Sequence, residues 1–231
     1  IVLCIMDKIE LLQSVPLFSD LSMVSLKKIS EKMVTRSYPK GKMVVIEESL
    51  GRTFFLIKSG AVKVTRMNED GREVILAMLG EGDFFGEMAL LDGEGRSANV
   101  VTIEEAILLS LQRGDFLYIL ESYPKIAIKL LEELTSRIRY SDQQIESLSL
   151  SDAEQRICIT IIRLAEDLGH IKGGTVHIDN LPYHQDIANM AGTSRETVSR
   201  VLKTLEEKKY LKRRGRKTVI RNFNKFCQLF S

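Results

Sequence analysis

The chain has 231 residues, enough for one large or two ordinary domains, because a single core seldom grows beyond about 250–300 residues. Apolar residues make up 44% and charged residues 28%, which excludes a collagen-like, low-complexity or largely disordered chain. No run approaches the roughly 18 apolar residues of a membrane-spanning helix, and the opening apolar stretch is too short for a signal peptide. We therefore expect a cytoplasmic protein with no membrane partner.

The three cysteines, Cys4, Cys158 and Cys227, lie far apart and lack the paired spacing of a zinc or iron–sulfur site. This usage fits a reducing compartment and predicts no metal ligands. The segment from Met6 reads like a natural start, so residues 1–5 are given no function.

Positive charge is concentrated near the C-terminal end. Between Arg195 and Lys225, twelve Lys or Arg and three acidic residues give a net charge of +9, so in a chain of +2 the rest carries −7. An acidic body with a basic end suits a protein whose C-terminal part contacts a polyanion. The alternative is a basic face that is merely solvated.

In chain order, apolar residues at helical spacing predict a short opening helix within residues 11–29, and the pattern changes at about Met33. Up to Leu111, short apolar or alternating runs are separated by Gly, Pro, Asn and Asp, which is typical of a β-sandwich. The clearest strands are expected at Phe54–Ile57, Val62–Thr65, Glu73–Met78 and Ala106–Leu111. A jelly roll is the natural candidate.

A long helix is expected from Pro124, because no further Gly or Pro occurs before Gly169. Its apolar residues recur in alternating steps of four and three, the seam of a parallel two-helix coiled coil. The expected dimer-interface residues are Leu131, Leu134, Ile138, Ser141, Ile145 and Leu148. Ser141 is the polar exception and a candidate for specificity or ligand contact. Alternatively, the stripe packs on the chain's own sandwich.

Residues 151–154 have the S-x-x-E pattern of a capping box before another apolar-periodic stretch, so we expect a new domain to begin near Leu150. Residues 184–203 carry the strongest local pattern in the chain. Apolar and small residues supply two helices, and Gly192 occupies the tight turn between them. This pattern predicts a helix-turn-helix whose recognition helix starts at Ser194.

The exposed face of the recognition helix fits a DNA major groove, since Arg suits guanine and Glu suits a cytosine amino group. The expected contacts there are Thr193, Ser194, Arg195, Glu196, Ser199, Arg200 and Lys203. A basic hairpin around Gly215 would form a wing on the phosphates, with Arg214, Arg216 and Lys217. Because Thr193 to Glu196 is also a capping box, Glu196 has a purely structural alternative.

Within the predicted sandwich, residues 80–98 read GEGDFFGEMALLDGEGRSA. A Gly-rich stretch exposes backbone amides to an anion, an Arg with a neighbouring Ser suits a phosphate, and a Glu can accept from ribose hydroxyls. The candidate ligand residues here are Gly86, Glu87, Met88, Ala89, Arg96 and Ser97. The alternative is that Glu87 and Arg96 form a simple ion pair between loops.

Two motifs, GDFFGEMALLDGEGRSA and TSRETVSRVLK, make the chain resemble the CRP/FNR, or catabolite activator, family of bacterial transcription regulators. The resemblance covers about Leu17 to Ile220. It implies an α+β fold with three parts: a cyclic-nucleotide-binding-like jelly roll (1–122), a dimerisation helix (123–150) and a winged helix-turn-helix (151–231). It also implies that Ser141 and Asp142 contact the adenine of the bound nucleotide, at positions where the catabolite activator has Thr and Ser.

Other members of this family sense gases through iron–sulfur or haem groups, but Cys4 is the one cysteine near the N-terminus and no histidine lies in the predicted first domain. We therefore expect no metal or covalent cofactor. The lack of histidines there also argues against a metal-dependent jelly-roll enzyme, so no catalytic residue is predicted.

These features predict a homodimeric, ligand-gated transcription regulator whose effector is a cyclic nucleotide, cyclic AMP or cyclic GMP. The expected partners are a second copy of the chain, RNA polymerase, and double-stranded DNA with a palindrome of TGA-containing halves. Two alternatives stay open. One is a regulator of the same family that needs no cyclic nucleotide or senses another anion, and the other is a cyclic-nucleotide-binding regulatory subunit that does not bind DNA.

Overall fold

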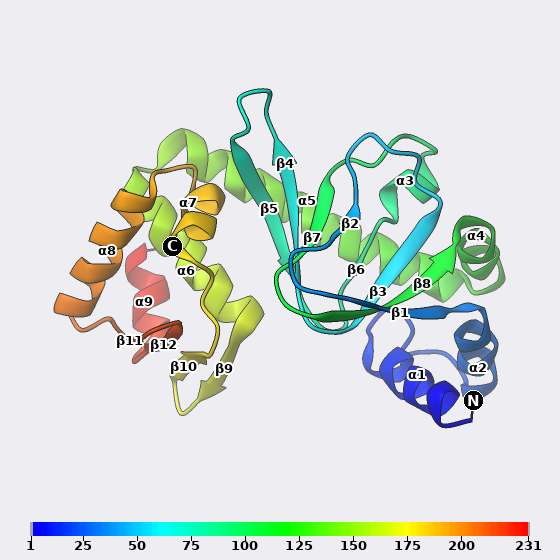
Figure 1. Cartoon of the computed structure of the whole chain (residues 1–231). Helices are drawn as coiled ribbons and strands as arrows, with labels where there is room; N and C mark the ends of the chain where they lie inside the picture. Colours follow the sequence, from blue (N-terminus) through cyan, green and yellow to red (C-terminus); the bar gives the residue numbers. More distant parts are fainter. Residues whose placement is uncertain (1, 231) are drawn as a thin grey trace. The chain divides into compact units, whose positions relative to one another are not determined.

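The computed structural model describes residues 2–230, with side chains from Met6 onward (Figure 1). The chain divides into two compact units, one of residues up to Arg139 and one of residues from Tyr140, with residues 73–75 grouped with the latter. This division falls inside helix α5 (Pro124–Leu150). The domain boundaries expected at 122/123 and 150/151 therefore stay predictions.

The first unit is a β-sandwich with helices. Its helices are α1 (Val2–Ser14), α2 (Met23–Lys32), α3 (Met88–Leu91), α4 (Arg113–Ser122) and the first part of α5. Its strands are β1 (Val34–Tyr38), β2 (Met43–Val45), β3 (Thr53–Ser59), β4 (Val62–Met67), β5 (Glu73–Leu79), β6 (Phe84–Phe85), β7 (Asn99–Thr102) and β8 (Ala106–Gln112). The four strands expected as clearest are all present, which confirms the β-rich N-terminal half.

Two sheets with strand orders β1-β8-β3-β6 and β2-β7-β4-β5 form the sandwich. Successive side chains of β3 point to opposite faces, as a strand's period of two requires. Phe54 packs on the helices, with its ring 4.8 Å from that of Phe116 in α4. Phe55 packs between the sheets, 5.0 Å from the ring of Phe85 in β6. Strand β3 therefore contributes side chains to both cores. Strand β6, which is paired with β3, continues into the turn at Gly86.

The opening segment forms two helices, so the expectation of a single short helix was wrong. Pro16 follows α1, where its missing N–H and fixed φ prevent the helix from continuing. Ser22 then caps α2, because its side chain accepts a hydrogen bond from the Ser25 amide at 3.3 Å.

The second unit begins with the end of α5 and contains α6 (Ala153–Leu168), α7 (His184–Ala191), α8 (Arg195–Glu207) and α9 (Phe223–Phe230). Its strands β9 (Gly169–Lys172), β10 (Thr175–Ile178), β11 (Leu211–Arg214) and β12 (Lys217–Ile220) form one sheet in the order β11-β12-β10-β9. The predicted helix-turn-helix and basic hairpin are confirmed.

The expected capping box at Ser151 and Glu154 was wrong by one residue. Asp152 is the N-cap of α6, and its carboxylate accepts from the Gln155 amide at 2.9 Å. Ser151 instead lies between the last residue of α5 and this cap.

Candidate functional sites

The turn between β6 and α3 positions the predicted ligand residues of the first unit. Gly86 has φ +84°, a left-handed conformation that favours glycine. A Cβ on Gly86 would lie 2.5 Å from Nη1 of Arg96, so the side chain of Arg96 occupies that space. The glycine therefore permits both the turn and the close approach of the guanidinium.

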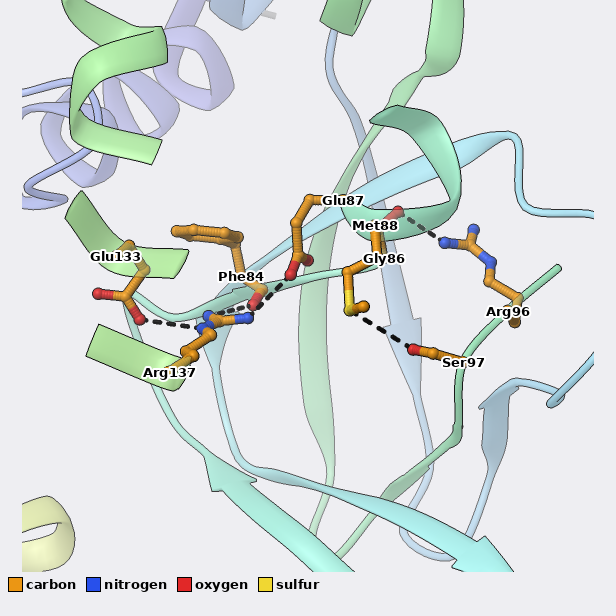
Figure 2. Close-up of polar contacts among 8 residues, drawn as sticks. All are labelled: Phe84, Gly86, Glu87, Met88, Arg96, Ser97, Glu133 and Arg137. Atoms are coloured by element: carbon orange, nitrogen blue, oxygen red, sulfur yellow. Dashed lines mark hydrogen bonds and ion pairs between the residues drawn. The ribbon is translucent and has the colours of Figure 1, made fainter. Parts of the chain in front are cut away.

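Arg96 is only 7% exposed and donates to two backbone oxygens, of which Figure 2 shows the carbonyl of Gly86. Its Nη1 donates to the Gly86 carbonyl and its Nη2 to the Thr53 carbonyl, both at 2.7 Å. A Cβ on Gly51 would lie 2.8 Å from Nε of Arg96, so this glycine also makes room for the side chain. Burial lowers the pKa of Arg96, while the charge of Glu87 opposes that change.

Glu87 is 3% exposed, and its ion-pair partner is Arg137 of α5. Nη1 of Arg137 lies 3.1 Å from the Glu87 carboxylate, its Nε lies 3.0 Å from Glu133, and its Nη2 donates to the Phe84 carbonyl at 2.9 Å (Figure 2). The guanidinium carbon also lies 4.6 Å from the centre of the Phe84 ring. Arg137 therefore joins α5 to the ligand turn within the first unit.

Burial raises the pKa of Glu87, and the positive charges of Arg137 and Arg96 oppose this rise. The site thus holds a buried carboxylate in the turn before α3 and a buried guanidinium in the segment between α3 and β7. Glu87 pairs with Arg137, and Arg96 bonds to backbone carbonyls, rather than the two side chains pairing with each other. The simple Glu87–Arg96 ion pair, our alternative from the sequence, is therefore not what the structure shows.

Sequence reasoning missed Arg137. Its partner Glu87 lies 50 residues away in the chain, and that contact depends on how α5 packs. The one local signal was Glu133 four residues earlier, the spacing of an ion pair along a helix.

The other predicted ligand residues are placed as follows. Met88 is 49% exposed, and Ser97 Oγ lies 3.6 Å from its sulfur, whereas Ala89 is buried in α3. Ser141 and Asp142 are exposed residues of α5 that belong to the second unit. Their contact with the base of a bound nucleotide stays a prediction.

Helix α5 has two apolar faces. Ile126 and Leu130 are buried in the core of the first unit, and Leu134 packs against the same core. Most of the expected dimer stripe is exposed: Leu131 63%, Ile138 62%, Ile145 63% and Leu148 55%. Packing on the chain's own sandwich thus accounts for Leu134 and leaves these four apolar side chains available for a partner.

The helix-turn-helix consists of α7, a turn at Gly192 and α8. Gly192 has φ +59°, and its left-handed conformation ends α7. Ser194 is the N-cap of α8, with its side chain accepting from the Thr197 amide at 3.2 Å, so the capping box we expected at Thr193 was displaced by one residue. Val198 and Val201 are buried, which turns the opposite face of α8 to solvent.

That outer face carries the residues predicted to read DNA. Arg195, Glu196, Ser199 and Arg200 are all exposed, and Lys203 is 77% exposed in its side chain. Hydrogen bonds from its own backbone N–H and from the Ser194 hydroxyl lower the pKa of Glu196. Glu196 is therefore a charged acceptor at the start of the recognition helix.

The basic residues of the hairpin β11–β12 differ in their exposure and in their contacts. Arg214 is exposed, and Lys217 is 74% exposed with Asp179 at 3.4 Å. Arg216 donates to the Leu181 carbonyl at 2.9 Å and stacks on the Tyr183 ring at 4.7 Å. Arg214 and Lys217 are therefore freer to reach a phosphate than Arg216.

Two negative findings apply to the described residues, 2–230. They contain no cluster of three His, Cys, Asp or Glu side chains suited to a metal ion. None of their helices is long and apolar enough to cross a bilayer.

A β-sandwich followed by a winged helix-turn-helix defines a class of protein, the DNA-binding transcription regulators. The family model described as a cyclic nucleotide-binding domain matches residues 35–123. The model described as a Crp-like helix-turn-helix domain matches residues 155–229.

Individual proteins agree with these matches. The chain is 36% identical to the cyclic AMP receptor protein of Thermus thermophilus, over 83% of this chain and 86% of that protein. Among solved structures, FixK2 from Bradyrhizobium japonicum superposes with a TM-score of 0.76 at 24% identity, covering 86% of this chain and 98% of the other. The c-di-GMP responsive regulator CLP of Xanthomonas campestris has a TM-score of 0.72 at 23% identity, covering 87% and 100%. The chain belongs to the CRP/FNR family of transcription regulators, which bind DNA through the helix-turn-helix and are not enzymes.

Proposed function

We propose that this protein is a homodimeric transcription regulator gated by a cyclic nucleotide that binds at the Gly86–Ser97 segment. The observation that carries the proposal is the pair of buried opposite charges in one Gly-rich segment, Glu87 before α3 and Arg96 after it. A ligand with hydroxyl donors and an anionic phosphate complements such a pair, since carboxylates accept from hydroxyls and guanidinium groups donate to phosphates. The cyclic AMP receptor of Thermus thermophilus, at 36% identity, supports this ligand class.

In the proposed complex, different residues of the Gly86–Ser97 segment bind the ribose and the phosphate of the nucleotide. Glu87 accepts from the ribose, held in place by Arg137, while Arg96 and Ser97 hold the cyclic phosphate. To do so, Arg96 exchanges one of its carbonyl partners, Gly86 or Thr53, for a phosphate oxygen. Gly86, Met88 and Ala89 complete the wall of the site, and Ser141 and Asp142 are the proposed base contacts.

The proposed output step uses the exposed faces of α5 and α8. Two copies pair through Leu131, Leu134, Ile138, Ser141, Ile145 and Leu148, and this pairing presents two recognition helices to a palindrome. In each half, containing TGA, the proposed base readers are Arg195, Glu196, Ser199 and Arg200. Thr193, Ser194, Lys203, Arg214, Arg216 and Lys217 are proposed to contact the backbone. RNA polymerase is the proposed further partner. The nucleotide acts only through different affinities for the two arrangements of the dimer.

Isothermal titration calorimetry with cyclic AMP and with cyclic GMP tests the ligand. We expect Arg96→Gln to weaken binding about ten- to hundredfold, the worth of one charge-assisted hydrogen bond. Arg36→Gln, an exposed arginine of β1, is the matched control and should bind like the wild type. Absence of heat with both nucleotides, or equal binding by Arg96→Gln, would overturn the assignment of the ligand.

A second candidate is a regulator of this family that responds to another anion or to none. The occupied N–H groups of Arg96 and the carboxylate of Asp142 favour it. Calorimetry with cyclic di-GMP, and selection of DNA from a random pool with and without cyclic AMP, separate this candidate from the first. The remaining alternative, a regulatory subunit that does not bind DNA, is contradicted by the match to a Crp-like helix-turn-helix domain.

A further inference from the structure

Arg156, in the first turn of α6, contacts two separate parts of the second unit. Its Nη1 donates at 2.9 Å to the carbonyl of Ser151, the residue between α5 and the cap of α6. Its Nε donates to the Ala191 carbonyl at 2.8 Å, and its Nη2 to the Gly192 carbonyl at 3.1 Å. One guanidinium thus bonds to the joint between α5 and α6 and to the turn before the recognition helix.

The two carbonyls in the turn are ones that α7 cannot satisfy itself. The last carbonyls of a helix lack intrahelical donors and carry the negative end of its dipole, so a cation there is stabilising. Because a guanidinium is planar and rigid, it fixes the spacing of all three acceptors. Moving the end of α5 relative to the turn therefore requires breaking charge-assisted hydrogen bonds.

Leu148 makes a second contact between the same two places. Its Cδ2 lies 2.9 Å from the position that a Cβ on Gly192 would take. The last turn of α5 therefore packs directly on the glycine of the helix-turn-helix. Leu148 is also 55% exposed and belongs to the stripe we assign to dimer pairing.

The recognition helix starts immediately beyond this contact. Ser194, the N-cap of α8, follows Gly192 by two residues, and the intervening Thr193 amide is bonded to the Ala188 carbonyl at 3.0 Å. A displacement of Gly192 is thus passed to the N-terminus of α8, where Arg195 and Glu196 are placed to read bases.

We propose that Arg156 and Leu148 form a linkage that makes the recognition helix follow the end of α5. Arg156 is then a positioning residue for the effector response, and the Ser151–Asp152 joint is held by its guanidinium rather than acting as a free hinge. This inference rests on the proposed function for its regulatory meaning, while the linkage itself can be measured without an effector.

Hydrogen–deuterium exchange of the full-length protein tests the linkage directly. We expect Arg156→Gln to speed exchange at least threefold both at the turn, around Thr193, and at the end of α5, around Ser151. Arg221→Gln removes an exposed positive charge from the same unit and should change neither segment. Faster exchange at the turn alone would overturn the linkage, because Arg156 would then be only a local cap of α7.

The regulatory role is tested by the ratio of DNA dissociation constants without and with saturating cyclic AMP. In the wild type we expect a ratio of about ten or more, and in Arg156→Gln a ratio within about twofold of one. A structural defect would weaken both states equally and keep the wild-type ratio, which would overturn the role.

If thermal denaturation shows that Arg156→Gln does not fold, Arg156→Lys, which keeps the charge but loses the planar fork, is measured in both experiments. A wild-type ratio or wild-type exchange in that variant contradicts the proposal. A wild-type ratio of one refutes the proposed function and leaves the exchange result to decide the linkage.

Discussion

At the scale of single residues, the ionisation of Glu87 depends on Arg137. The carboxylate is almost fully buried, burial raises its pKa, and the guanidinium of Arg137 opposes that rise. The Glu87 carboxylate therefore binds a proton more readily in the folded protein than in the unfolded chain. As a result, Glu87 lowers the free energy of unfolding as the pH rises above the pKa that it has in the unfolded chain.

Replacing Arg137 by Gln should lower the free energy of unfolding by about 1–3 kcal/mol, because a buried charged acceptor loses its cationic donor. The pKa of Glu87 should rise further in the variant, so the loss should be larger at about pH 8 than at about pH 5. Urea unfolding at both pH values measures this, with Arg139→Gln, an exposed neighbour on α5, as the control. Equal losses at both pH values would contradict the explanation.

His184, the first residue of α7, is a neutral histidine. Its Nε2 lies 3.0 Å from Nη1 of Arg213, and because arginine only donates, the imidazole nitrogen must accept. Burial first, then the charges of Arg213 and Arg195, lower its pKa. The folded protein therefore binds fewer protons here than the unfolded chain does.

Stability should consequently fall as pH drops below about 6.5, the ordinary pKa of histidine, because the unfolded state then takes up the proton first. His184→Gln keeps an acceptor without a titrating ring, so its free energy of unfolding should change less between about pH 7.5 and about pH 5.5. Asn180→Gln, an exposed position of the same unit without a titrating side chain, should behave like the wild type. If all three proteins lose the same free energy on acidification, His184 does not titrate as described.

At the scale of elements, helix α5 carries one set of apolar residues that is buried and another set, on a different face, that is exposed. Ile126 and Leu130 face the first unit's core, while Leu131, Ile138, Ile145 and Leu148 are left exposed. Apolar residues in steps of three and four along an exposed helix face are typical of a helix that pairs with a second copy.

Ile138→Asp should raise the dimer dissociation constant at least about a hundredfold, since pairing would bury two facing carboxylates in an apolar seam. Ser136→Asp, on the exposed outer face of the same helix, should leave it within about threefold. Sedimentation equilibrium measures both constants. A wild-type protein that stays monomeric at micromolar concentration would rule out the proposed seam.

Most elements could be predicted from local patterns. The strands of the sandwich, the long helix, the helix-turn-helix and the basic hairpin each combine a clear period with Gly or Pro boundaries. Helix α4, helix α9 and the β9–β10 hairpin were missed because they are short; the helical spacing of Phe223, Phe226 and Phe230 in α9 extends over only two turns. The two caps were displaced by one residue since Ser151 and Asp152, like Thr193 and Ser194, are adjacent capping residues, and only backbone conformation selects one.

The residues of the proposed ligand site could be picked out from the sequence, whereas the residues that hold them could not. Glu87 and Arg96 lie in one Gly-rich motif whose residue types already suit a nucleotide. Arg137, which holds Glu87, and Arg156, which holds the Gly192 turn, contact residues 50 and about 35 positions away. Such contacts depend on tertiary packing, which no local period records.

At the scale of the whole molecule, the chain keeps an acidic body and a basic end on a protein of nearly balanced charge. In the CRP/FNR family, to which it belongs, the basic end is the DNA-binding part. Counterion release makes the contribution of phosphate contacts fall with salt, whereas the proposed base contacts by Arg195 and Arg200 depend on sequence. Affinity must therefore be compared at one fixed salt concentration.

The most direct test measures the affinity of the purified protein for a palindrome with TGA halves, at fixed salt, with and without cyclic AMP. The account predicts binding at least about tenfold tighter with the nucleotide. At a nucleotide concentration that just saturates the wild type, Arg96→Gln should lose most of that gain while its affinity without nucleotide is unchanged. Equal affinity in the presence and absence of the nucleotide would contradict the claim that an anion held in the sandwich controls DNA binding.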